Sequence, residues 1–341
     1  MVASLVLPGC RAAYLSQLAW QQVRYLSGAQ SIEELIKHEG DPGRRARLEL
    51  VLEVRRFAAS QGLDPEGSFA KVADTEGTKP FQVVTAAHAD RLEAYTWWYP
   101  VIGAVPYRGY FDRESAEAFA QTLRDEHLDV RIVEASAYST LGWFNDPLPA
   151  GLLENDSVEI AVVVLHELVH QHYFLPGSVD FNETLANALG YHLAERFFAE
   201  RADTESVATV VAARSRWLER SRVLDDLALR LEEYFSEARS GDISFDNMLS
   251  GRARLYEKAR AELEAAGVLR SSTRGKEFPL DNATFLAVRR YARAAPLIDS
   301  FVGQHGGDAR ALEALRELDM GDGPFAALET EAGLAPIVSP P

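Results

Sequence analysis

The feature that most constrains this fold is a long apolar run that leads directly into two histidines. Residues 158–165 are almost entirely apolar, and six apolar residues in a row can form a strand as well as a helix. Asp156, followed three residues later by Glu159, is typical of the start of a helix. We therefore predict one helix over 157–175, with Asp156 as its N-cap. Because this helix is apolar nearly all round, we expect it to be buried.

The predicted helix carries the pattern His-Glu-x-x-His at its C-terminal end. Residues four apart lie on one face of a helix, so His166 and His170 can reach the same metal ion. Glu167 lies beside the first histidine, where a general base can activate a water molecule. The alternative is an ordinary helix with two histidines on one face. Chance placement of the 8 His and 51 acidic residues gives the pattern only roughly 0.03 times per such chain.

A third ligand can come from Glu183, thirteen positions past His170. Two histidines, one carboxylate and an open position are the arrangement of catalytic zinc rather than of a closed structural site. Alternatively, Asp180 caps the next helix and Glu183 occupies its third position, a capping box that needs no metal. The two roles can coexist. The residues that compete with Glu183 as third ligand are Asp180, His172, His192 and Glu195, of which His172 and His192 should face away.

Asn187 lies one turn after Glu183 and shares its helix face. A side chain in that place can orient a metal ligand by a hydrogen bond. The alternative is an ordinary solvated or helix-packing polar residue. We include Asn187 in the predicted site as a positioning residue.

Several segments together resemble a known family. HELVHQ at 166–171, followed by FLPGSVDFNETLAN at 174–187, is similar to the gluzincin metallopeptidases, which carry HExxH on one helix and a Glu ligand on the next. The resemblance is closer to a bacterial group of predicted zinc aminopeptidases, many of them lipoproteins. Other segments that resemble this group are residues 9–22, 55–63, 97–111, 137–148 and 280–301. Members often carry a Cys pair where Trp98 and Ala104 stand here, so that disulfide is absent.

The pattern and the resemblance predict a zinc-dependent metallopeptidase, with Zn²⁺ held by His166, His170 and Glu183. Glu167 would take a proton from the attacking water and later pass it to the leaving amine. The aminopeptidase activity is implied by the resemblance alone, since no acidic residue stands out as a holder of the substrate's free amine. Two alternatives are a non-catalytic zinc-binding envelope lipoprotein, acting as a binding or assembly module, and a helical protein with fortuitous His spacing.

Gluzincins usually have an edge strand before the active-site helix that pairs with an extended peptide substrate. The resemblance places this strand at 139–144, with Ser139 and Gly142 as substrate-binding residues, and an interior strand is the alternative. The developing oxyanion also needs a donor. Tyr138, which borders the strand, is the first candidate. The other candidates are Tyr107, Arg108 and Tyr191. Arg108 is also predicted to bind a substrate carboxylate, with a structural ion pair as the alternative.

Charge and cysteine content constrain the partners and the location. The net charge of −16 disfavours binding to nucleic acid and to anionic membranes, which need basic patches. No segment is long and apolar enough for a transmembrane helix. The single cysteine, Cys10, ends a Leu-Pro-Gly-Cys sequence that resembles a lipobox, although no basic residue precedes the short apolar run. This resemblance implies a bacterial cell-envelope lipoprotein attached through Cys10, and a cytoplasmic protein is the alternative.

The order of predicted elements favours an α+β fold with a zincin-like catalytic unit, in which a strand-rich N-terminal half precedes the active-site helix and a mostly helical C-terminal half. Predicted helices before the active-site helix cover 11–38, 44–61 and 112–127. Predicted strands comprise two or three within 80–111, then 129–133 and 136–144. Later helices cover 203–239, 245–266 and 281–304. The predicted units are a lipoprotein signal remnant (1–10), N-terminal helices with an α/β subdomain (11–155), a helical subdomain with the metal site (156–335) and a disordered tail (336–341).

Overall fold

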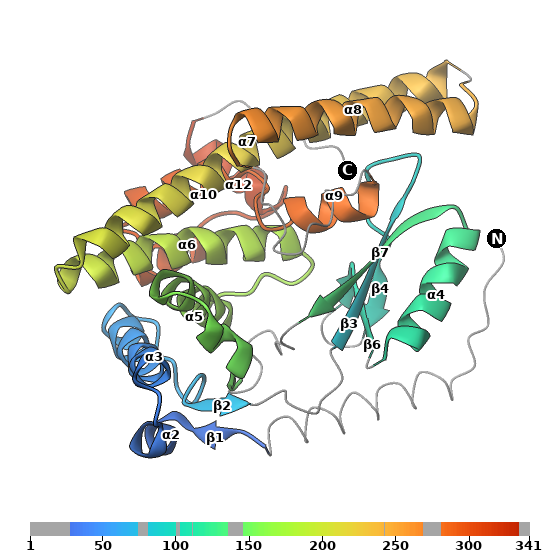
Figure 1. Cartoon of the computed structure of the whole chain (residues 1–341). Coiled ribbons are helices and arrows are strands. Elements are labelled where there is room, and N and C mark those ends of the chain that lie inside the picture. Colours follow the sequence, from blue (N-terminus) through green and yellow to red (C-terminus); the bar gives the residue numbers. More distant parts are fainter. Residues whose placement is uncertain are drawn as a thin grey trace.

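The structure is a computed structural model that describes residues 28–73, 81–99, 103–110, 112–135, 146–241, 243–268 and 281–333. Within these ranges, small sheets dominate the first half and long helices dominate the second (Figure 1). The predicted α+β class, with a strand-rich N-terminal half and a helical C-terminal half, is therefore confirmed. None of the helices in the described ranges is long and apolar enough to cross a bilayer.

Helix α5, Ser157–His172, is the helix predicted from the apolar run. The side chain of Asp156 accepts a hydrogen bond from the backbone N–H of Glu159, which satisfies a donor left free at the helix start. The helix ends before the predicted residue 175 because the backbone of Tyr173 is already extended, with φ −146° and ψ 123°. Most of its apolar residues are buried, as predicted, while Val158, Val162 and Val163 are partly exposed.

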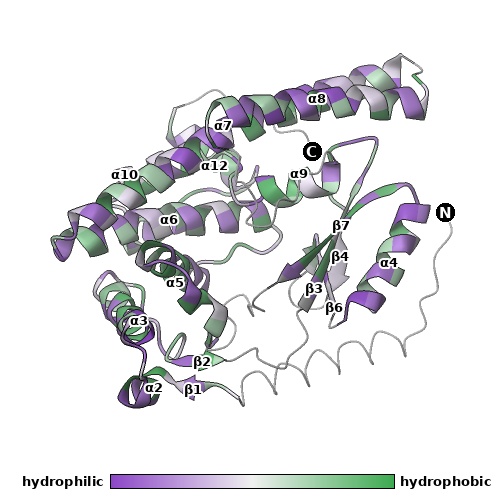
Figure 2. Ribbon diagram, viewed as in Figure 1, coloured by the Kyte–Doolittle hydropathy of each residue, from purple (hydrophilic) through white to green (hydrophobic). Residues whose placement is uncertain are grey.

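A body of long helices surrounds α5. Helix α3, Pro42–Ser60, and helix α6, Val179–Glu200, both pack against it. Helix α7, Thr204–Ser240, packs on α6 and forms a hairpin with α8, Phe245–Ala265. Helix α10, Ala295–Gln304, contacts α6 and α7. One cluster of buried apolar side chains joins these helices, and Figure 2 shows α5 coloured as hydrophobic over much of its length.

The main sheet forms a separate lobe. Strand β3, Phe81–His88, pairs in antiparallel fashion with β6, Arg108–Tyr110, on one side and with β7, Leu128–Ala135, on the other. Helix α4, Arg113–Asp125, packs on this sheet and encloses a small apolar cluster of its own. Helix α9, Asn282–Arg289, comes from the far end of the chain and contacts β3 and β7. The sheet lobe therefore has a core that is distinct from the core of the helical body.

A buried polar junction joins the sheet lobe to the helical body. Asp129 on β7 lies 2.5 Å from the guanidinium of Arg252 on α8 and accepts a hydrogen bond of 2.8 Å from the backbone N–H of Asn282. The side chain of Asn282 is fully buried. It donates to the carbonyl of His88 at 2.8 Å and accepts from the hydroxyl of Tyr256 at 2.6 Å. Because buried polar groups need such partners, this network fixes how the two parts meet.

Several predicted boundaries need correction. The described residues within 80–111 form four strands. Between β3 and β6 in the sequence, β4, Trp97–Tyr99, and β5, Gly103–Val105, form a hairpin. The helix predicted over 281–304 is two helices, α9 and α10. The chain turns between them at Ala294, whose φ of 51° is left-handed. In the predicted helix 11–38, the described part begins with a short strand, β1, Gln30–Ser31, before α2, Ile32–His38.

The helices predicted over 44–61, 112–127, 203–239 and 245–266 and the strand at 129–133 are confirmed within a few residues. The strand predicted at 136–144, the lipobox at Cys10 and the tail at 336–341 lie outside the described residues. The remaining elements are β2 (Lys71–Ala73), β8 (Leu148–Pro149), the 3-10 helix η1 (Ala150–Glu154), α11 (Ala309–Arg316) and α12 (Pro324–Glu331).

Candidate metal centre

Three predicted ligands meet where α5 packs on α6. His166 Nε2 lies 3.2 Å from His170 Nε2. Glu183 Oε2 lies 3.3 Å from His166 Nε2 and 3.5 Å from His170 Nε2. Bonds of about 2.0–2.1 Å at tetrahedral angles put the ligand atoms of a zinc ion about 3.4 Å apart. The three distances therefore fit a single tetrahedral ion.

The environment of this triad also suits a cation. His166, His170 and Glu183 are 8%, 5% and 8% exposed. Burial raises the pKa of Glu183, but hydrogen bonds from the two histidines outweigh it, so the pKa lies below its ordinary value. Burial lowers the pKa of His166, but the carboxylates of Glu183 and Glu167 outweigh it and raise that pKa. The site thus stabilises a carboxylate and a positive charge beside it, as a metal site requires.

Two contacts set the distance between α5 and α6. A Cβ on Gly190 would lie 3.1 Å from the carbonyl oxygen of Val162 and 3.5 Å from the Cβ of His166, so glycine allows α6 to approach at this point. The loop before α6 is held by Asn182, whose amide donates to the carbonyl of Leu175 at 2.9 Å and accepts from its N–H at 3.0 Å. These contacts bring the carboxylate of α6 to the histidines of α5.

The side chain of Asn187 bridges the metal site and a distant turn. Its Oδ1 lies 3.0 Å from His166 Nδ1, and its Nδ2 donates to the backbone carbonyl of Tyr291 at 2.8 Å. With Asn187 as acceptor, Nδ1 of His166 carries the proton and Nε2 presents its lone pair to the triad. This is the contact that the predicted positioning role of Asn187 requires.

Tyr291 is the site residue that the sequence analysis missed. It lies in the turn between α9 and α10, where its carbonyl accepts hydrogen bonds of 2.8 Å from Asn187 and from Trp217 Nε1. The carboxylate of Glu183, and more weakly that of Glu167, raise the pKa of its phenol well above the ordinary value. Tyr291 is therefore tied to the triad through Asn187, and its phenol is subject to the field of the Glu183 carboxylate.

The comparison with known families agrees with this geometry. The family described as "Putative aminopeptidase" matches residues 13–321. The chain belongs to this family. Comparisons with curated proteins and with solved structures each gave no match. The family match covers the helical body, the sheet lobe and the metal triad, so all three belong to one aminopeptidase-family unit.

In this member of the aminopeptidase family, two of the predicted site residues, Tyr107 and Arg108, have different surroundings. Tyr107 lines an open hollow next to His170 and Glu183. The guanidinium of Arg108 instead lies over the rings of Phe119, at 4.8 Å, and Tyr110, at 5.5 Å. Neighbouring residues point to opposite sides of a strand, so Arg108 faces α4 rather than the metal triad. The contact that the structure gives Arg108 is with these aromatic rings, and its predicted substrate-binding role stays a prediction.

The other predicted candidates also have definite places. Tyr191 packs against the ring of Trp217, with centroids 5.4 Å apart. The residues of the predicted substrate strand lie outside the described residues: Tyr138, Ser139 and Gly142. The competing ligands all have partners elsewhere: Asp180 with Arg290 (3.7 Å), His172 with the carbonyl of Leu168 (3.0 Å), His192 with Asp299 (3.1 Å) and Glu195 with Arg214 (3.0 Å).

The capping-box alternative for Glu183 is wrong. Ser178 occupies the N-cap position and α6 begins at Val179, so Asp180 already lies inside the first turn. Glu183 is the fifth residue of the helix and its side chain points to the histidines. The sequence could have found Tyr291 only through the segment 280–301, which resembles the family, because its contact with Asn187 depends on the turn between α9 and α10.

Proposed function

We propose that the protein is a zinc-dependent peptidase whose metal is held by His166, His170 and Glu183. The observation that carries this proposal is the triad, because its three ligand atoms are buried and lie 3.2–3.5 Å apart beside an open hollow. Zinc, when bound, lowers the pKa of a coordinated water and polarises the substrate carbonyl. Membership of the family supports a peptide substrate and an aminopeptidase activity.

Glu167 supplies the proton transfers. It follows the first ligand on α5, and its carboxylate acts electrostatically on both His166 and Tyr291. From this position it takes the proton of the attacking water and then delivers it to the nitrogen of the leaving amine. The C–N bond of the peptide breaks in that step, and the carboxylate of Glu167 is restored.

Tyr291 stabilises the charge that develops on the substrate oxygen. A tyrosine phenol is protonated at neutral pH, and the carboxylate of Glu183 raises the pKa of Tyr291 further, so the hydroxyl can donate a hydrogen bond that strengthens as the carbonyl oxygen becomes negative. Tyr291 is 45% exposed, so a substrate can reach it from solvent. Asn187 is a positioning residue, because it holds both His166 and the backbone of Tyr291 in place.

Metal analysis and hydrolysis measured together test this function. We expect about one zinc ion per chain in the wild-type protein and in Glu167→Gln, and little in His166→Ala, by elemental mass spectrometry. Hydrolysis of a peptide library should be lost in both variants. If Glu167→Gln retains turnover near that of wild type, the proposed proton transfer is wrong. If zinc is absent from the wild-type protein even after incubation with the ion, the metallopeptidase proposal fails.

A further inference from the structure

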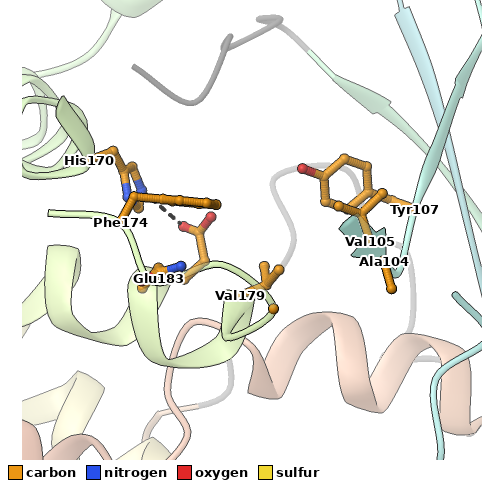
Figure 3. A pocket seen from close by; sticks show the side chains of 9 residues that line it. Ala104, Val105, Tyr107, His170, Phe174, Val179 and Glu183 are labelled. Atoms are coloured by element: carbon orange, nitrogen blue, oxygen red, sulfur yellow. Dashed lines mark ion pairs between the residues drawn. The ribbon is translucent and has the colours of Figure 1, made fainter. Parts of the chain in front are cut away.

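The open hollow beside the triad has two walls that come from different parts of the fold. The hollow is continuous with solvent. One wall is formed by Phe174, Gly177 and Val179 at the junction of α5 and α6. Figure 3 shows Phe174 and Val179 beside Glu183, and the opposite wall across the space from them. That wall is formed by Ala104, Val105 and Tyr107 at the hairpin of the sheet lobe.

Among the residues that the structure describes, the lining away from the metal ligands is mostly apolar, with the hydroxyl of Tyr107 and the amide of Asn182 as its polar groups. Both ends of the Asn182 amide are used on the backbone of Leu175. The nearby carboxylate of Asp180 is paired with Arg290 and Arg293, each at 3.7 Å. A charged side chain that entered the hollow would lose water without gaining an ionic partner from these residues. An apolar side chain would bury its surface against Phe174 and Val179 at no such cost.

We infer that this hollow is a subsite for an apolar side chain of the substrate, from a residue next to the scissile bond. This inference rests on the proposed peptidase function. His170 and Glu183 line the hollow and are also metal ligands, so an occupant of the hollow adjoins the reacting carbonyl. The specificity-determining residues are Phe174 and Val179 on one wall and Val105 and Tyr107 on the other.

The substitution Val179→Asp tests the subsite by reversing its chemistry. Val179 is the first residue of α6, where a carboxylate is compatible with the helix dipole, so the variant should fold. The same change at Val211, an exposed valine of α7 at 37% exposure that does not line the hollow, is the matched control. The readout is the kcat/KM of peptides that differ only beside the scissile bond, where they carry Leu, Lys or Glu.

We expect the wild-type protein and Val211→Asp to prefer the Leu peptide by about tenfold or more, a typical discrimination for an apolar pocket. Val179→Asp should lose this preference and favour Lys. Calorimetric binding of the same peptides to zinc-loaded Glu167→Gln, with and without Val179→Asp, should follow the same order. Equal use of Leu and Lys by the wild-type protein, or an unchanged preference in Val179→Asp, overturns the subsite and leaves the peptidase proposal standing. If no peptide is cleaved, the peptidase proposal and the subsite fail together.

Discussion

Asn187 Oδ1 lies 3.0 Å from Nδ1 of His166, one turn along α6 from the ligand Glu183. The other end of the same amide donates to the carbonyl of Tyr291 at 2.8 Å. A single side chain therefore sets the tautomer of a metal ligand and holds the backbone of Tyr291. The two ends can be separated by mutation, which makes their functions measurable.

Asn187→Ala should weaken zinc binding by about 10–100-fold, because His166 loses the acceptor that orients its ring. Asn187→Asp keeps an acceptor for His166 but removes the donor to Tyr291. We expect Asn187→Asp to retain zinc affinity and to lose turnover. The measurement is a zinc titration in competition with a chelating dye, run beside steady-state hydrolysis. Equal zinc affinity in Asn187→Ala and wild type would refute the orienting role.

Tyr291→Phe should lower kcat by about 10²–10³-fold, as expected for removal of one oxyanion donor. Zinc content and KM should stay near those of the wild-type protein, because the ring and the backbone contacts remain. Tyr191→Phe is the matched control, since Tyr191 packs on Trp217. If Tyr191→Phe is as impaired as Tyr291→Phe, the donor has been assigned to the wrong tyrosine.

Gly190→Ala should separate α5 from α6 at the metal site. The added methyl would press on the carbonyl of Val162, 3.1 Å away, and on the Cβ of His166. Overpacking of this kind costs about 1–3 kcal/mol, so we expect a lower Tm together with weaker zinc binding. Gly151→Ala is the control, because nothing lies within 4 Å of a Cβ built there. Thermal unfolding with and without zinc gives both effects.

Asp308 should make the stability depend on pH in the acid range. Burial raises its pKa, but hydrogen bonds from Arg310 and Arg196 outweigh it and lower the pKa to about 2. An unfolded Asp has a pKa of about 3.9, so the ion pairs stabilise the fold above that pH, and the stabilisation is lost as the pH falls toward 2. Asp308→Asn keeps an acceptor for the start of α11 but removes the charge.

We expect Asp308→Asn to reduce the free energy of unfolding at pH 7 by about 1–2 kcal/mol, because Arg310 is exposed and its contribution is screened. The difference between the variant and the wild-type protein should shrink between about pH 5 and pH 2. Urea unfolding at a series of pH values measures it. A difference that is constant over this range would mean that the charge of Asp308 contributes nothing.

The sequence predicts those parts of the molecule that local signals define. The cap at Asp156 and the His166–His170 spacing depend on neighbours in the chain, so both follow from helix geometry. Glu183 was predicted as the third ligand from its place after the pattern. The predicted cap at Asp180 failed because α6 begins two residues earlier than such a cap requires, and each residue rotates a side chain by about 100° around the helix.

The residues that the sequence did not reveal act through tertiary contacts. Tyr291 contacts Asn187 from the turn at residues 290–294, and periodicity alone predicts one continuous helix for that region. Gly190 has meaning only against Val162 on another helix. The sequence also did not reveal the contact of Arg108 with Phe119, because the face that Arg108 takes depends on where β6 begins. In each case the missing information is which surfaces meet.

The polar junction around Asn282 has a consequence for the width of the hollow beside the triad. One wall of the hollow belongs to the helical body and the other to the sheet lobe, which have separate apolar cores. Buried hydrogen bonds of Asp129 and Asn282 join these two parts. Apolar packing resists compression but tolerates sliding, whereas hydrogen bonds fix an angle. The distance between the two walls of the hollow is therefore set at the polar junction, away from the metal ligands. Substitutions in the junction therefore offer a way to change the size of the side chain that the proposed subsite accepts, while the metal ligands and Glu167 stay unchanged.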